Sequence, residues 1–125
     1  MKKIYSTEHA PAAIGPYSQA VDTGDLVFLA GQTPIDPATG KLVEGDVSEQ
    51  AYQALTNIKA VLAAADLEMR HVVKATVFLT TMDDFQAVNK VYGEFFPEDP
   101  PARSAVAVSA LPMGCNVEIE VIARR

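Results

Sequence analysis

The sequence has few of the features that mark secreted or membrane proteins. It contains one cysteine, Cys115, which cannot form an internal disulfide. No apolar run is long enough to span a bilayer, and the basic start at Lys2 and Lys3 is not followed by the apolar stretch of a secretory signal. We therefore expect a cytoplasmic protein that does not enter membranes.

Groups that bind metals, phosphates or nucleic acids are also scarce. The two histidines, His9 and His71, lie far apart and outside any ligand-spaced cluster, and the seven glycines fit turns better than a phosphate-binding loop. Ten basic residues against sixteen acidic ones give a formal net charge of −6, with no basic stripe. Proteins that neutralise phosphates usually show the opposite balance. The sequence therefore shows no metal-ligand set and no phosphate-binding loop, and it disfavours nucleic acid as a partner.

The chain does have the composition of an ordinary globular protein. Of its 125 residues, 49% are hydrophobic and 21% are charged, which is enough apolar material for one core. Glycine and proline are spread along the chain as punctuation, and no linker, repeat or low-complexity tract is visible. We predict a single domain over residues 1–125.

Hydrophobic spacing predicts both helices and strands. Apolar residues recur at three- and four-residue steps over 47–65, which predicts a helix capped by Asp46. A second helix is predicted over 85–95, capped by Asp83 or Asp84 and ended by the prolines that follow. The predicted strands cover 17–21, 26–32, 72–79, 104–109 and 116–123, with a further short strand compatible with 2–5 and a loop over 34–45. This order predicts an α+β fold, a mixed sheet with two helices on one face.

The predicted sheet has more apolar surface than two helices can cover. The segments 27–30, 77–79 and 105–108 are apolar at consecutive positions, whereas a strand with one wet face should alternate. So short a chain has no third layer, so the second face needs another subunit. The pattern alone therefore predicts an oligomer.

The last predicted strand does alternate. Val117, Ile119 and Val121 share one face, while Glu118 and Glu120 share the other with Asn116 and Ile122. If the helices cover the valine face, the two glutamates project towards the subunit interface. Carboxylates are costly there unless they are paired or lie in a wet cavity.

Arg103 is the most suggestive single residue. It follows two prolines and an alanine and opens into the apolar run 104–108. An arginine held by a rigid segment is suited to bidentate capture of a carboxylate, but a structural ion pair with a neighbouring acid is an equal alternative. Glu118 is a candidate general base if it lines the same cavity, and its alternative is a partner for that arginine or a solvated edge carboxylate.

Other polar residues carry weaker signals. Tyr17 and Asn89 are more often packing or capping residues than catalytic ones, and Cys115 lacks a histidine partner that would make it a nucleophile. The residues by themselves therefore predict an oligomeric α+β protein with a candidate anion pocket.

Taken together, several segments resemble the RidA/YjgF family, whose members are also labelled reactive intermediate deaminases, L-PSP endoribonucleases or translation initiation inhibitors. The resemblance covers essentially the whole chain, in order and at sensible spacing. It rests on 10–19, on Gly31-Gln32, on 73–79, on Phe85, Asn89, Tyr92, Phe95 and Phe96, on 101–104 and on 117–123.

The resemblance implies a fold and a site. It implies a chorismate-mutase-like domain in a homotrimer whose sheets form a central barrel, with clefts between subunits. Arg103 takes the family's carboxylate-binding position, and Glu118 the position that holds or activates the hydrolytic water. Tyr17 and Asn89 match other cleft residues, and Gly31 matches the residue whose backbone carbonyl faces the substrate nitrogen.

The implied reaction is hydrolysis of 2-iminopropanoate or 2-iminobutanoate to a 2-keto acid and ammonia without a cofactor. Two positions depart from many members. Ala105 replaces a cysteine, so that only its backbone serves the cleft, and Ala30 replaces a serine. The segment between Phe96 and Arg103 also lacks an aromatic residue found in some members, and we expect these changes to affect substrate range more than the reaction.

Two alternatives stay open on the sequence. The first is a trimer that binds small carboxylates without turnover; an acid beside the arginine favours catalysis instead. The second is the endoribonuclease or translation-inhibitor role of the family label, against which the net charge of −6 argues.

Overall fold

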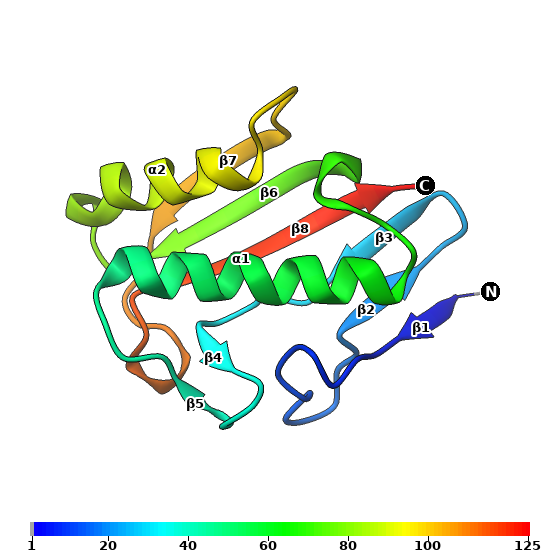
Figure 1. The fold of residues 1–125 in the computed structure, drawn as a ribbon, viewed down its shortest axis with the longest axis horizontal. Helices are drawn as coiled ribbons and strands as arrows, with labels where there is room; N and C mark the ends of the chain where they lie inside the picture. The colour runs from blue at the N-terminus through cyan, green and yellow to red at the C-terminus, as the bar shows by residue number, and fades with distance from the viewer. Residues whose placement is uncertain (1) are drawn as a thin grey trace.

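The computed structural model describes residues 2–125 and contains a six-stranded sheet (Figure 1). Only β6 and β7 run parallel, because helix α2 carries the chain back between them; every other neighbouring pair is antiparallel. In sheet order, the strands are β1 (Lys3–Tyr5), β2 (Ala20–Asp22), β3 (Leu26–Leu29), β8 (Val117–Arg124), β6 (Val72–Leu79) and β7 (Ala102–Ala107).

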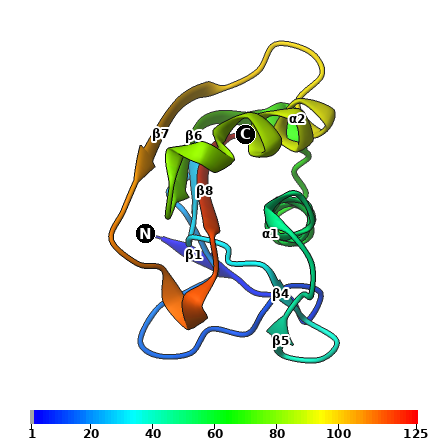
Figure 2. The same cartoon turned by 90° about the vertical axis from the view of Figure 1, so that its left-hand side faces the viewer.

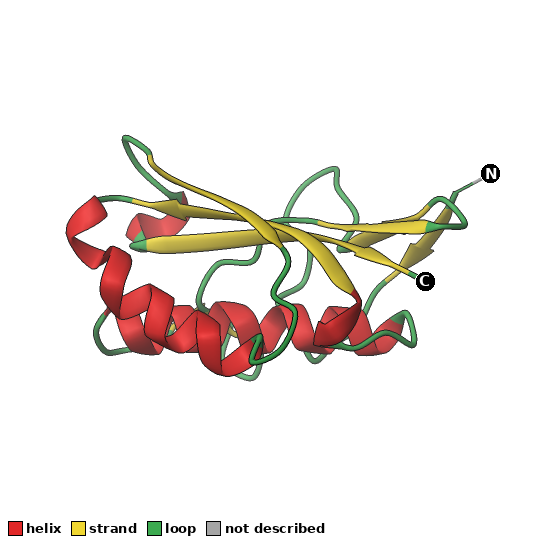
Figure 3. Cartoon of the chain, turned by 90° about the horizontal axis from the view of Figure 1, so that it is seen from above, coloured by secondary structure: helices red, strands yellow, loops and turns green. Residues whose placement is uncertain are grey.

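Two helices, α1 (Val47–Ala64) and α2 (Phe85–Phe95), lie on the same side of this sheet (Figure 2 and Figure 3). The cap predicted for the first helix is confirmed, since Asp46 Oδ1 accepts a hydrogen bond from Glu49 N at 3.1 Å. Asp84 occupies the N-cap position of the second helix, as one of the two predicted candidates, but its side chain makes no capping hydrogen bond. A short 3₁₀ turn, Met82–Asp84, comes first, and the Thr81 hydroxyl caps it. The predicted α+β architecture with both helices on one face is confirmed.

Strand β8 shows how the core forms. Val117, Ile119 and Val121 are buried under the helices, whereas Glu118 is half-buried and Glu120 exposed on the other face, as the alternation predicts. The second face carries apolar side chains that nothing in residues 2–125 covers. Among them are Phe28 of β3, which is 42% exposed, and Val106 of β7, which is 43% exposed.

Several predicted boundaries need correction. The strand predicted over 17–21 begins only at Ala20, because the Gln19 side chain instead bonds the backbone of Thr7 and Pro11. The strand predicted over 26–32 ends at Leu29, after which Gln32 forms an isolated bridge with Ile119. The loop predicted over 34–45 contains a two-stranded ribbon, β4 (Ile35–Asp36) and β5 (Lys41–Leu42). The strands predicted over 104–109 and 116–123 lie at Ala102–Ala107 and Val117–Arg124.

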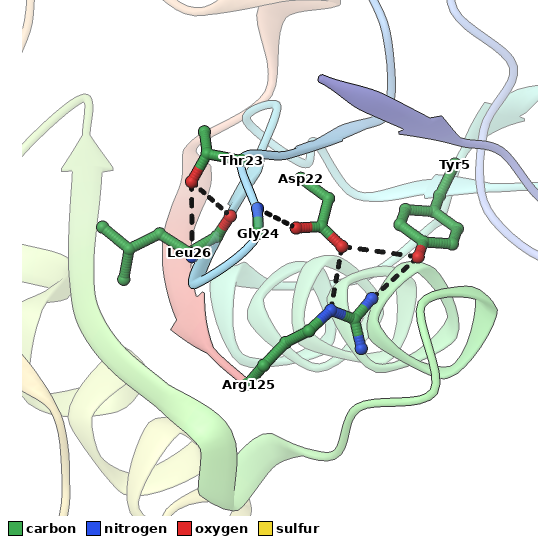
Figure 4. A network of polar contacts seen from close by, with 6 residues as sticks. All are labelled: Tyr5, Asp22, Thr23, Gly24, Leu26 and Arg125. Carbon is green, nitrogen blue, oxygen red and sulfur yellow. Dashed lines mark hydrogen bonds and ion pairs between the residues drawn. The ribbon is translucent and has the colours of Figure 1, made fainter. Parts of the chain in front are cut away.

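The end of β8 is tied to the first two strands (Figure 4). Asp22 Oδ2 accepts a hydrogen bond from Arg125 Nε at 2.8 Å, and Arg125 Nη2 donates to the Tyr5 hydroxyl at 2.8 Å. Gly24 N donates to the other oxygen of Asp22 at 2.7 Å. The network links β1, β2 and the C-terminal residue. No helix in the described part of the chain is long and apolar enough to cross a bilayer.

Candidate functional site

Arg103 lies inside strand β7 and is held by helix α2. It stands beside Ala75 of β6, which faces the helices, so its side chain points to the helix side of the sheet. Arg103 Nη1 donates to Asn89 Oδ1 at 2.7 Å. The guanidinium carbon lies 4.8 Å from the centre of the Tyr92 ring and 5.5 Å from that of Phe85. One amide and two aromatic rings therefore orient Arg103.

The spacing along α2 explains this arrangement. Phe85, Asn89 and Tyr92 are four and three residues apart, which puts all three on one face of the helix. Asn89 occupies one donor of Arg103 and leaves the others for a ligand. Within residues 2–125 no carboxylate forms an ion pair with this guanidinium, so the structural ion pair considered above is not formed there. An oriented arginine without an acidic partner is suited to binding an anionic ligand.

Glu118 lies on the opposite face of the sheet, close to Gly31. A Cβ atom built on Gly31 would collide with Glu118 Oε2 and would lie 3.0 Å from its Cδ atom. Any side chain at position 31 would have to displace the Glu118 carboxylate from its present place. Two backbone hydrogen bonds between Gln32 and Ile119, of 2.8 and 3.1 Å, hold the segments together. The structure thus places the Gly31 backbone directly beside the Glu118 carboxylate.

A hollow of about 550 Å³ opens above this pair. Tyr17, Gly31 and Glu118, three residues singled out in the sequence, line it together. Its remaining wall is mostly apolar and includes Ile14 and Met113. The arrangement combines one carboxylate and exposed backbone with an apolar lining, which is typical of sites for small organic ligands.

Burial changes the acidity of Glu118. Desolvation raises the pKa of its carboxyl above the ordinary value, and the neighbouring charge of Glu120 raises it further. A carboxyl group with a raised pKa can accept and return a proton near neutral pH more readily than an ordinary glutamate.

The predicted site residues form two groups within one chain. Arg103, Asn89 and Ala105 lie on the helix side of the sheet; Ala105 stands beside the buried Val77 of β6. Tyr17, Gly31 and Glu118 meet on the other side. The sheet therefore separates the two groups, and one chain does not bring them together.

The histidines and the cysteine considered in the sequence are not part of this site. His71 Nδ1 accepts a hydrogen bond from Glu68 N at 2.9 Å, which is a capping role, and His9 is exposed. Cys115 is buried, and burial raises the pKa of its thiol, which disfavours a nucleophilic role. Among the described residues, no three histidine, cysteine or acidic side chains form a cluster that could hold a metal ion.

Sequence reasoning missed three groups at the site. Phe85 and Tyr92 enter the prediction only through the family resemblance, although their spacing around Asn89 already indicates that all three can hold one side chain. Met113 carries no local sequence signal that it faces the hollow. Asn57 was also overlooked. This fully buried residue of α1 donates to Thr33 O at 3.1 Å and Ile35 O at 2.9 Å, which positions the segment after Gly31.

Comparison with known proteins identifies the family. The sequence model described as "Endoribonuclease L-PSP" matches residues 7–125. The chain belongs to this family. The predicted resemblance to RidA/YjgF proteins is thereby confirmed.

Members of the L-PSP family with similar sequences carry specific names. A Bos taurus protein named 2-iminobutanoate/2-iminopropanoate deaminase is 54% identical over 98% of this chain and 90% of its own length. A Salmonella typhimurium protein of the same name is 51% identical over 100% of this chain and 99% of its own. The crystal structure of E. coli TdcF with bound serine has a TM-score of 0.94 and 46% identity, covering 98% of both chains.

Proposed function

We propose that this L-PSP family member hydrolyses 2-iminobutanoate and 2-iminopropanoate to 2-keto acids and ammonia in the cytoplasm. The observation that carries the proposal is the orientation of Arg103 by Asn89 and two rings, with no acid in residues 2–125 to neutralise it. These substrates carry a carboxylate that such a guanidinium binds. The names of the Bos taurus and Salmonella relatives support the same reaction.

The complete site forms between two copies of the chain in a homotrimer. Arg103 and Glu118 leave opposite faces of one sheet, so an Arg103 that meets a given Glu118 comes from a neighbouring copy. The apolar side chains exposed on the Glu118 face, such as Phe28 and Val106, supply a surface for that association. Serine bound to the related TdcF supports a site for a small amino or imino acid.

The reaction needs positioning and one group that transfers protons. Arg103 binds the substrate carboxylate and sets the imine carbon over a water next to Glu118. The Gly31 carbonyl accepts a hydrogen bond from the imine nitrogen, the Ala105 backbone lines the cleft, and Tyr17 closes it on the far side.

Glu118 takes a proton from this water as the water oxygen attacks the imine carbon. The electrons of the C=N bond move to nitrogen, which takes up a proton from solvent, and a tetrahedral aminol results. Glu118 then returns its proton to the nitrogen, the C–N bond breaks, and the aminol hydroxyl gives its proton to solvent, which leaves the ketone and ammonia.

An assay of imine hydrolysis tests the proposal. An amino-acid oxidase with catalase generates the imine in situ, and semicarbazide traps what remains. The variants are Arg103→Ala and the control Arg70→Ala, which alters an exposed surface pair. We expect wild type and Arg70→Ala to deplete the imine and Arg103→Ala to match buffer. Equal depletion by all three, or by none of them with either imine, would overturn the proposal.

The second candidate is a trimer that binds small carboxylates without turnover, and the bound serine of TdcF favours it. It requires Arg103 but gains nothing from the raised pKa of Glu118. Saturable binding of pyruvate or serine without any imine hydrolysis would support it. The family description also names an endoribonuclease, and RNA cleavage that survives Arg103→Ala through repeated purification would support that activity.

A further inference from the structure

Met113 has a backbone conformation that its side chain does not favour. It lies in the turn Pro112–Gly114 with φ of 58° and ψ of 18°, the left-handed region that glycine and asparagine adopt most easily. Its side chain is 57% exposed and contributes nothing to the core. A strained residue with an exposed apolar side chain points to a role in binding.

Ile14 is the second unexplained apolar side chain, and it lies on a segment far from Met113 in the sequence. It is 81% exposed. The chain around it is nevertheless held in place: Ile14 N donates to the Tyr17 hydroxyl at 3.3 Å, and Gln19 Nε2 donates to Pro11 O at 2.7 Å. Ile14 is therefore presented on a supported loop.

Both side chains line the hollow that contains Glu118 and the Gly31 backbone. Glu118 supplies a carboxylate to the hollow and Tyr17 and Thr33 supply hydroxyl-bearing side chains, whereas the wall formed by Ile14, Ile35 and Met113 is apolar. A ligand that fits both parts has a polar reacting end and an aliphatic tail. The flexible thioether of Met113 can adapt to tails of different length.

We propose that Met113 and Ile14 form a subsite for the substrate's side chain, so that this protein prefers 2-imino acids with aliphatic side chains of three or more carbons. The inference rests on the proposed function for the reaction itself and goes beyond it in naming the substrate class. Met113 and Ile14 act here on specificity and take no part in proton transfer.

The same two side chains could instead be subunit contacts, and this alternative makes a different prediction. A subunit contact supports the oligomer and is indifferent to substrate length. A subsite changes the preference for length and leaves the oligomer intact. Light scattering and a homologous series of substrates separate the two.

The test uses variants that keep the left-handed turn. Met113→Gly removes the side chain and Met113→Asn replaces it with a short polar one, and both residues tolerate a positive φ. Met82→Ala is the matched control, because Met82 is an exposed methionine in another turn that does not line the hollow. Imines are generated from L-alanine, L-2-aminobutyrate, L-norvaline and L-norleucine.

We expect kcat/KM of wild type and Met82→Ala to rise about threefold to fourfold for each added methylene. Both Met113 variants should lower the ratio of the norleucine-derived to the alanine-derived substrate about tenfold. Unchanged ratios, with 2-iminopropanoate still hydrolysed, would overturn the subsite and leave the proposed function standing. Dissociation of the oligomer in Met113→Gly but not in Met82→Ala would also overturn it.

A binding measurement separates failure of the subsite from failure of the reaction. The corresponding 2-keto acids, from pyruvate to 2-oxohexanoate, are titrated by calorimetry without any turnover. Affinity that rises with chain length in wild type and not in Met113→Gly supports the subsite even if no imine is hydrolysed. Affinity independent of chain length in wild type would contradict it.

Discussion

Arg103 and Glu118 of one chain project from opposite faces of the same sheet, with strand β6 between the strands that carry them. Arg103 stands beside Ala75, and Glu118 stands beside Phe78, three positions further along β6. Paired residues share a face, and Ala75 and Phe78 face opposite ways because they are an odd number of positions apart. A cleft that uses both residues therefore needs two copies of the chain.

Mixed oligomers test this relationship. Arg103→Ala and Glu118→Gln should each be inactive alone, whereas oligomers refolded from an equal mixture should recover activity. In random trimers about one quarter of the clefts would combine an intact Arg103 with an intact Glu118 from two copies. Recovery near that fraction of wild-type activity is expected. Absence of recovery, with mixed oligomers shown by mass spectrometry, would place both residues in one chain's site.

The hydrogen bond from Arg103 to Asn89 should matter for substrate binding. Asn89→Ala frees the guanidinium, and we expect KM to rise about tenfold, the lower end of what a hydrogen bond to a charged group contributes. Asn89→Asp should be worse, because its carboxylate would pair with Arg103 and compete with the substrate. A KM for Asn89→Asp that is no higher than the KM for Asn89→Ala would contradict this role.

Tyr92 should contribute its ring and not its hydroxyl. The ring lies under Arg103, while the buried hydroxyl has no hydrogen-bond partner within the described chain. Tyr92→Phe keeps the stacking and removes a desolvated polar group, so we expect unchanged KM and about 1 kcal/mol more stability in urea unfolding. Tyr92→Leu removes the aromatic face and should raise KM. Marked destabilisation by Tyr92→Phe would show that the hydroxyl is bonded in the assembled protein.

The raised pKa of Glu118 predicts the pH dependence of the reaction. If the ionised carboxylate accepts the proton from water, kcat/KM falls as the pH drops through this raised pKa, above the range of an ordinary glutamate. Glu120→Gln removes the neighbouring charge and should move this acid limb to lower pH. An acid limb that stays in place would mean that another group titrates.

The same raised pKa predicts that Glu118 costs stability at neutral pH. A carboxyl whose pKa is higher in the folded state favours folding when protonated, and this contribution is lost as the pH rises through the folded-state pKa. Glu118→Gln should therefore raise Tm at pH 7 and leave it nearly unchanged at pH 4. The opposite order of the two Tm differences would contradict the direction of the shift.

Asp22 predicts the opposite trend. The hydrogen bond from Gly24 N, and then the Arg125 guanidinium, hold the pKa of this carboxyl below its ordinary value. Its contribution to folding is therefore present above the ordinary value of 3.8 and is lost as the pH falls through the lower folded-state pKa. Asp22→Asn should lower Tm at pH 7, and the difference should shrink in acid. A Tm difference that is constant with pH would mean that packing, and not charge, is lost.

Much of the fold could be predicted because its signals are local. The three- and four-residue spacing behind α1 and the alternation along β8 depend on neighbours within one element, so both appear in the structure as predicted. Strand ends were less predictable. Tyr17 lies outside the sheet because the Gln19 side chain bonds a distant backbone, and no local pattern reports such a contact.

The site also combines features that local sequence patterns predict with features that depend on long-range contacts. The sequence by itself determined that Glu118 faces away from the buried valines and that Arg103 adjoins an apolar strand, because side-chain direction follows from strand period. Only the tertiary structure decided that Arg103 rests on α2, that Glu118 meets Gly31, and that the sheet separates the two. These relationships depend on which strands pair across the chain. Such pairing is set by packing over long sequence distances, which residue spacing does not encode.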